Sequence, residues 1–241
     1  MIESLSMLRG RDIELSNGIT IQQPTLGQIE ELDEDKYMSM LSIFVSTPFD
    51  MIAQLHKMGV DFTKISSYQL FCSFYQLLEL EETQILFGDL DFQKFKLVGN
   101  DNRIELHYRD IVINESVYNE IVDCLRLINS LSPPKFKGVA NEYTKQKMIE
   151  DAEQELELAK RRGNKHKSAL RTLVSRLSNH PYFKYRLDEV WDMKIYAFYD
   201  ALKSVNIIES TNHLSVGAYS GNLDLSKINK NEFNWLREVK N

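Results

Sequence analysis

The chain has 241 residues, which is the length of one large domain or two small ones. Charged residues make up 27% and hydrophobic residues 43%, a composition that is typical of a folded protein and excludes disorder along the whole chain. No apolar run approaches the ~20 residues of a membrane span. Residues 1–11 lack the apolar stretch and cleavage site of a signal peptide, so we expect neither membrane insertion nor secretion.

The net charge of −6 is divided unevenly along the chain. Residues 1–134 carry −11, whereas residues 135–241 carry +5. Ser132-Pro133-Pro134 cannot continue a helix and separates the two parts. We therefore predict a mixed α+β domain over residues 1–132 and a helical domain over residues 133–241. Their opposite charges favour contact with each other or with a protein partner.

The first part is predicted to begin with a hairpin and to continue with helices. Apolar and polar residues alternate over 13–15 and 19–21, on either side of the turn Ser16-Asn17-Gly18. Thr25 and Gln28 have the spacing of a capping box for a helix that runs through Leu32. Helical spacing and N-cap residues predict further helices over 35–46, 48–58 and about 67–78, with Met58 and Leu77 among the inward-facing side chains.

The middle of the chain is predicted to form a small antiparallel sheet. Strand candidates are residues 84–87, 92–98, 103–108 and 111–113. Asn114 then caps a helix whose apolar face is formed by Val117, Ile121, Leu125 and Ile128. The expected fold class is α+β and mostly helical, with the hairpin and the sheet in the first part and helices in the second.

The second part is predicted to be helical. Residues 141–162 form a long charged helix with a narrow apolar stripe, which is typical of a helix that packs on one side or bridges to a partner. Gly163-Asn164 ends or interrupts it, and a second helix covers about 168–177. A third helix is predicted over 187–205, a turn over 217–221 and a last short helix over about 231–239. The third helix is expected to turn inward Val190, Trp191, Ile195, Phe198 and Leu202.

Motifs that carry catalysis or bind a cofactor are missing from the sequence. The five histidines are scattered, and there is no H-E-x-x-H, C-x-x-C or glycine-rich phosphate loop. Cys72 and Cys124 lie on apolar helix faces and are interpreted as buried, inert thiols of a protein in a reducing compartment. The dense carboxylates of residues 30–35 fit a solvated helix junction better than a catalytic pair. We expect no enzymatic activity, no metal and no cofactor.

A basic run allows two interpretations. Six cationic side chains in twelve residues bind nucleic acid in a salt-dependent way when they contact phosphates. The acidic stretch over 150–157 repels a phosphate backbone, however, and supplies i, i+4 pairs such as Glu157 with Arg161. We favour a solvated patch that docks an acidic protein surface, and keep nucleic acid as an alternative that we do not expect. The run consists of Lys160, Arg161, Arg162, Lys165, Lys167 and Arg171.

The order of several short motifs resembles proteins encoded in the tail-gene clusters of phages and prophages. The similarity is to tail assembly chaperones and to baseplate-hub assembly proteins of tailed phages. It covers most of the chain and depends mainly on the order of apolar helices and turns. The motifs are Ile21-Gln22-Gln23-Pro24-Thr25-Leu26-Gly27-Gln28-Ile29, Thr47-Pro48-Phe49-Asp50, Gly59-Val60-Asp61-Phe62, Trp191-Asp192-Met193-Lys194-Ile195-Tyr196, Gly217-Ala218-Tyr219-Ser220-Gly221 and Asn234-Trp235-Leu236.

This resemblance implies a role in assembling the phage tail, by binding the long helical tape-measure protein while the tail tube polymerises around it. A partner of this kind covers exposed apolar stripes reversibly. The long helix would lie along the tape measure or another tail protein through Met148, Ile149 and Leu156, beside the basic run, unless these anchors pack within the chain. Self-association stays open. The expected location is the cytoplasm of the bacterial host, or the virion if the protein is instead a structural tail or baseplate component.

Overall fold

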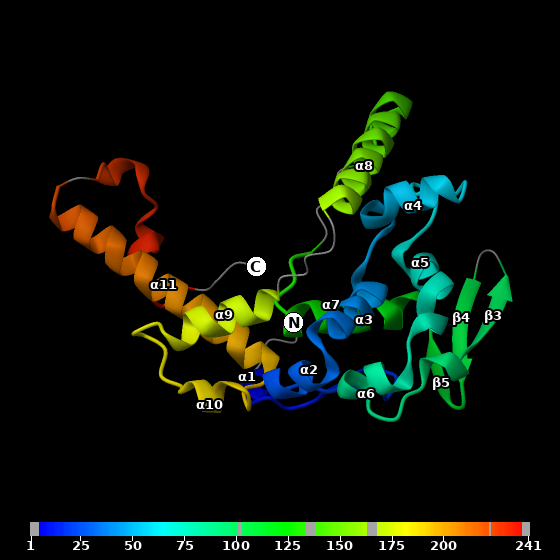
Figure 1. Ribbon diagram of the computed structural model, residues 1–241, viewed down its shortest axis with the longest axis horizontal. Helices are drawn as coiled ribbons and strands as arrows, with labels where there is room; N and C mark the ends of the chain where they lie inside the picture. Colours follow the sequence, from blue (N-terminus) through cyan, green and yellow to red (C-terminus); the bar gives the residue numbers. More distant parts are fainter. Residues whose placement is uncertain (1–4, 101–102, 134–137, 163–167, 222, 238–241) are drawn as a thin grey trace.

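The computed structural model describes residues 5–100, 103–133, 138–162, 168–221 and 223–237. The molecule is elongated, with a three-stranded sheet at one end and a long helix, α11, reaching out at the other (Figure 1). A second long helix, α8, stands beside α4 and points away from the remaining helices. The fold is α+β and mostly helical, with two small antiparallel sheets, as predicted.

The N-terminal hairpin and the first capped helix are confirmed. A short helix α1 (Leu5–Leu8) precedes the antiparallel strands β1 (Ile13–Glu14) and β2 (Thr20–Ile21). The capping box of α2 (Leu26–Leu32) is reciprocal. The amide of Gln28 donates to Thr25 Oγ1 at 3.1 Å, and the amide of Thr25 donates to Gln28 Oε1 at 2.9 Å.

The three predicted helices that follow are present, but 3-10 turns interrupt two of them. A 3-10 turn shifts the angular position of later side chains, which sends Leu77 (63% exposed) into solvent, while Met58 (69% exposed) lies just past the end of its helix. Both residues were predicted to face inward, so these two predictions are wrong. The elements are α3 (Glu34–Val45), η1 (Pro48–Met51), α4 (Ile52–Lys57), α5 (Ser67–Phe74) and η2 (Tyr75–Leu77).

The predicted strand over residues 84–87 is wrong, because these residues form the end of helix α6 (Leu80–Phe87). Thr83, Leu86 and Phe87 are buried at helical spacing, and Gly88 (φ +59°) ends the helix. The turn η3 (Phe92–Lys94) likewise replaces the start of the next predicted strand. The sheet has the order β3-β4-β5 and consists of β3 (Lys96–Asn100), β4 (Arg103–Tyr108) and β5 (Ile111–Ile113).

Helix α7 (Glu115–Ile128), capped by Asn114 as predicted, packs against α3 and α5, which contribute to an aromatic core. The ring of Phe44 is 5.2 Å from each of the rings of Phe71, Phe87 and Phe92. Buried tyrosines add directed contacts: Tyr118 Oη donates to the carbonyl of Phe44 at 2.8 Å. Offset and edge-on ring pairs stabilise a core beyond the apolar area that they bury.

The second part is helical, as predicted, but its third predicted helix is broken. Residues 191–194 separate α10 from α11, and Trp191 is 40% exposed rather than inward-facing. Helix α11 then continues to Tyr219, so the turn predicted over 217–221 begins inside a helix that Gly221 (φ +72°) follows. The elements are α8 (Glu142–Arg162), α9 (Ala169–Ser178), α10 (Leu187–Val190), α11 (Ile195–Tyr219), η4 (Leu225–Lys227) and η5 (Lys230–Phe233).

The final predicted helix is wrong in type, because the 3-10 turn η5 occupies its start. Its last residues, 238–241, lie outside the described part of the chain. The predicted helix break at Gly163-Asn164 also lies outside the described part.

One apolar core joins both predicted domains, because residues from Met7 to Ile128 share a cluster with Val174 and Phe198. The division into two separate domains stays a prediction.

Within the described residues, no single helix has the length and hydropathy of a membrane span. Helix α3 together with Pro48–Lys57 has this length and hydropathy only as a pair bent by 118°.

Candidate interaction surfaces of the second part

Helix α8, which the sequence singles out as a partner-binding element, is docked on α4. Ile149 is 6% exposed and belongs to a small apolar cluster with Ile52, Leu55, Phe62 and Leu70. Met148 and Ala152 are partly buried against the same cluster. Two of the three predicted apolar anchors therefore contact the first part of this chain. The third, Leu156, is half-buried and belongs to neither apolar cluster among the described residues.

Polar contacts flank Ile149 on both sides. Lys145 Nζ lies 2.7 Å from Asp61 Oδ2, and His56 Nδ1 lies 3.1 Å from Glu153 Oε1. The hydrogen bond from Lys145, together with two from Thr63, holds the pKa of Asp61 well below its usual range. Asp61 correspondingly raises the pKa of Lys145. The helix is thus held by the buried Ile149, with Met148 and Ala152 beside it, between an ion pair and a hydrogen-bonded histidine.

The predicted basic run lies partly outside the described residues. Lys160 and Arg161 are exposed at the end of α8, and Arg161 Nη2 lies 3.4 Å from Glu157 Oε2. Arg162 ends the helix, while Lys165 and Lys167 fall in the gap before α9. Arg171 is exposed in the first turn of α9. The structure does not place these cations on one described surface, so their role in binding stays a prediction.

The acidic junction between α2 and α3 meets the start of α9. Glu34 Oε1 accepts hydrogen bonds from the amides of Ala169 (3.0 Å) and Leu170 (3.1 Å). The N-cap Ser168 accepts a further bond from the amide of Arg171 through its own side chain. A carboxylate is stabilised there because the first amides of a helix are unpaired and carry partial positive charge. A carboxylate of the first part thus binds the start of a helix in the second part.

Residues 191–195 pair with the segment before α2 as two short extended stretches. The amide of Leu26 donates to the carbonyl of Met193 at 3.0 Å, and the amide of Ile195 donates to that of Pro24 at 2.9 Å. Thr25 and Lys194 form an antiparallel bridge. This pairing gives the backbone of residues 191–194 hydrogen bonds outside a helix, which explains the break between α10 and α11.

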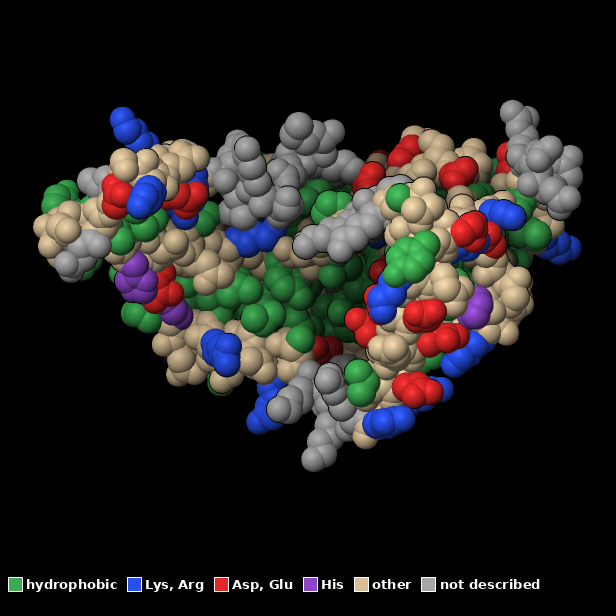
Figure 2. Space-filling view, turned by 90° about the horizontal axis from the view of Figure 1, so that it is seen from above, with side chains coloured by type: hydrophobic (Ala, Val, Ile, Leu, Met, Phe, Trp, Pro, Cys, Tyr) green, Lys and Arg blue, Asp and Glu red, His purple; other side chains and the backbone are tan. Residues whose placement is uncertain are grey.

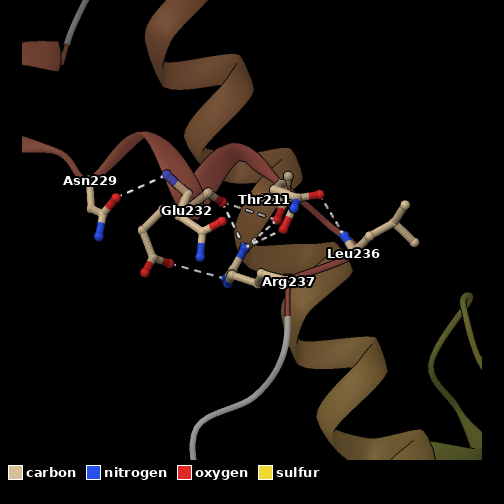
Figure 3. A network of polar contacts seen from close by, with 7 residues as sticks. Thr211, Asn229, Glu232, Leu236 and Arg237 are labelled. Atoms are coloured by element: carbon tan, nitrogen blue, oxygen red, sulfur yellow. Dashed lines mark hydrogen bonds and ion pairs between the residues drawn. The ribbon is translucent and has the colours of Figure 1, made fainter.

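The outer half of α11 and residues 223–237 form an arm, which the C-terminal segment closes by folding back (Figure 1). Arg237 holds this segment in place (Figure 3). Its Nη1 donates to Thr211 Oγ1 at 2.8 Å and to the carbonyl of Glu232 at 2.7 Å, and its Nη2 lies 3.2 Å from Glu232 Oε2. Sequence reasoning missed this contact, because an arginine near a chain end gives no local signal.

Apolar side chains remain exposed on the arm and near the middle of the molecule. Val216 and Tyr219 of α11 and Trp235 and Leu236 of the returning segment are all more than half exposed. Figure 2 shows hydrophobic side chains gathered in a hollow at the middle of one face. Exposed apolar surface of this kind is typical of proteins that bind other proteins.

Residues 163–240 match the family model described as YomV second domain. The matched part of the chain is phage-associated. It makes up about a third of the sequence and contains α9, α10, α11 and the arm. No curated protein and no solved structure matches the chain.

Possible metal ligands and cysteine thiols are dispersed among the described residues. No three histidine, cysteine or carboxylate side chains there are placed to hold a metal ion. Cys72 and Cys124 are both free thiols, and burial raises the pKa of each to about 11. Cys124 is buried, as predicted, whereas Cys72 is only partly buried. Thiols with a raised pKa are poor nucleophiles near neutral pH.

Proposed function

We propose that the protein is a non-enzymatic phage protein that assists tail assembly by binding a helical partner, with the tape-measure protein as the expected client. The observation that carries this proposal is the docking of α8, because the surface formed by α4 and α5 already holds an amphipathic helix. A tail chaperone needs this kind of contact, with an apolar centre and charged flanks.

The phage association of residues 163–240 supports the proposal that this is a phage protein. The choice of the tape-measure protein as the client follows from the resemblance to tail assembly proteins. Exposed apolar side chains on the arm, such as Tyr219 (94%) and Trp235 (59%), support protein binding as the activity. The proposed location is the cytoplasm of the infected or lysogenic host, where the tail is built.

The test is co-expression of the protein with the tape-measure protein encoded by the same phage. We expect the soluble fraction of the tape measure to rise and the two proteins to co-purify. An unchanged soluble fraction together with no co-purification would count against a chaperone. Mass spectrometry of mature particles distinguishes a chaperone from a structural tail or baseplate component, because a chaperone is absent from the finished virion and a structural component is retained.

Nucleic-acid binding is a weaker candidate. The described cations at the end of α8 follow directly on the carboxylates of residues 150–157, and Arg161 is paired with Glu157. Filter binding at low and moderate salt tests it, since phosphate contacts weaken steeply as the salt concentration rises.

A further inference from the structure

Helix α8 covers an apolar groove that belongs to the first part of the chain. Ile52 and Leu55 of α4, Leu70 of α5 and Phe62 of the connection between these helices form the groove, and each is at most 6% exposed. Phe49 packs edge-on against Phe62, with 5.3 Å between ring centroids. The groove is therefore built from several large side chains on short, connected helices.

In contrast, α8 buries few of its own side chains in this contact. Among its side chains that the structure describes, Ile149 is the one that is buried. Within the described residues, α4 is the one helix or strand with which α8 has an extensive contact. Most of its surface is charged and faces solvent, in keeping with the narrow stripe in its sequence.

Two clefts of about 320 Å³ each show that the groove is wider than α8. The first lies beside Ile149 and is lined by Phe62 and Asp61 from the groove and by Lys145 from α8. The second continues along α4 and α5 toward the sheet, past Leu55, Met58 and Leu97. Met58 is 69% exposed there, and flexible methionines adapt to different partners.

We propose that this groove is a docking site for an amphipathic helix of a partner protein, and that α8 is an internal occupant which the partner displaces. The contacts of α8 define the chemistry of the partner helix. Lys145 pairs with Asp61, Ile149 enters the apolar groove, and Glu153 pairs with His56. The partner therefore carries a cation, a large apolar residue and a carboxylate at positions i, i+4 and i+8, which lie on one helix face.

Competition with α8 sets the affinity of the site. A tethered helix acts at an effective concentration that reaches the millimolar range. A partner binds only molecules in which the groove is empty, so its apparent affinity is the intrinsic affinity multiplied by the fraction of such molecules. A partner helix with larger apolar side chains gains affinity by filling the two clefts. Helices that do not match the groove cannot displace α8. This inference builds on the proposed function, because it names the surface on which a helical client would bind.

A labelled synthetic peptide of residues 141–162 is the probe, and the full-length chain is the receptor. The variant Ile149→Asp weakens the hold of α8 without changing the groove. We expect this variant to bind the peptide at least about tenfold more tightly than the unmodified chain does. Gln154→Asp adds the same charge to the exposed face of α8 and is the matched control, with the affinity of the unmodified chain.

A charge exchange locates the bound peptide. In the Ile149→Asp chain, adding His56→Glu should weaken the unmodified peptide about two- to fivefold, and a Glu153→Lys peptide should recover that loss. Binding of the peptide to the folded Ile149→Asp chain no tighter than to the unmodified chain would overturn the proposal. Should that variant fail to fold, Lys145→Glu, which places a carboxylate beside Asp61, replaces it with the same expectation.

The two proposals fail separately. If the chain binds the peptide in the groove but leaves the tape measure insoluble, the docking site is supported and the proposed tail function is refuted. If the chain never binds the peptide, and solubilises the tape measure equally well with and without His56→Glu, the proposed function is supported and the docking site is refuted.

Discussion

The backbone amide of Gly27 donates a hydrogen bond of 2.8 Å to the carbonyl oxygen of Trp191, which joins the first turn of α2 to the break between α10 and α11. A Cβ atom at position 27 would lie 3.2 Å from that oxygen. The glycine thus allows two backbones from opposite ends of the sequence to approach closely. The phage-associated segment is attached to the first part of the chain at this point.

Replacing Gly27 by valine is expected to weaken this attachment, because the branched side chain pushes against the carbonyl of Trp191. Overpacking of this kind costs about 1–3 kcal/mol of unfolding free energy. Urea denaturation followed by circular dichroism measures the change. Gly138→Val is the control, since nothing lies within 4 Å of a Cβ built there. Equal stability of the two variants would contradict the structural role given to Gly27.

The hydroxyl of Tyr37 is expected to stabilise the core through its hydrogen bond of 2.8 Å to Asn129 Oδ1. Both side chains are at most 5% exposed, so Tyr37→Phe leaves a buried carbonyl oxygen without this partner. We expect a loss of about 1–3 kcal/mol in unfolding free energy, measured by urea titration. Tyr143→Phe changes an 80% exposed side chain and should alter stability by less than about 0.5 kcal/mol.

Arg237→Ala is expected to release the returning segment of the arm from α11. The side chain of Arg237 is 11% exposed and bonds both Thr211 and Glu232. Hydrogen bonds to a charged group contribute about 1.5–3 kcal/mol, so local opening should become about tenfold more frequent or greater. Trypsin cleavage after Lys227 and Lys230 measures this opening. Arg186→Ala, at a 78% exposed side chain, should leave the cleavage rate unchanged.

The two cysteines are expected to resist thiol reagents in the folded protein. A pKa of about 11 leaves roughly one thiol in a thousand as thiolate at pH 8, and only the thiolate reacts. Reaction with a disulfide reagent should be slow in buffer and should modify both thiols in denaturant. The rate in buffer should increase with pH up to about 11. Rapid modification of either thiol at pH 7 would contradict its raised pKa.

Local signals in the sequence predicted the capped helices well. Thr25 with Gln28, and Asn114, form the side-chain contacts that their spacing predicts. These contacts join residues three positions apart, so they need no information from the rest of the fold. The β4 and β5 strands were predicted for a similar reason, because β4 alternates polar with apolar residues and β5 is a short run of β-branched residues.

The failures lie where distant contacts decide the structure. A short apolar run such as residues 84–87 fits a strand or a helix equally well, and packing against the core selected the helix. The unbroken helix predicted over 187–205 is interrupted because residues 191–195 bond to the backbone before α2. Propensity favours a helix there, and tertiary hydrogen bonds override it.

The sequence by itself determined that α8 is a long charged helix with a narrow apolar stripe and that the two parts carry opposite charge, because both properties depend on residue type and spacing alone. Only the tertiary structure decided that Ile149 enters a groove on α4 and that Lys145 meets Asp61. These contacts join residues far apart in the chain, and a stripe on one helix does not specify the surface that receives it. Charge complementarity and the shape of the groove make that choice.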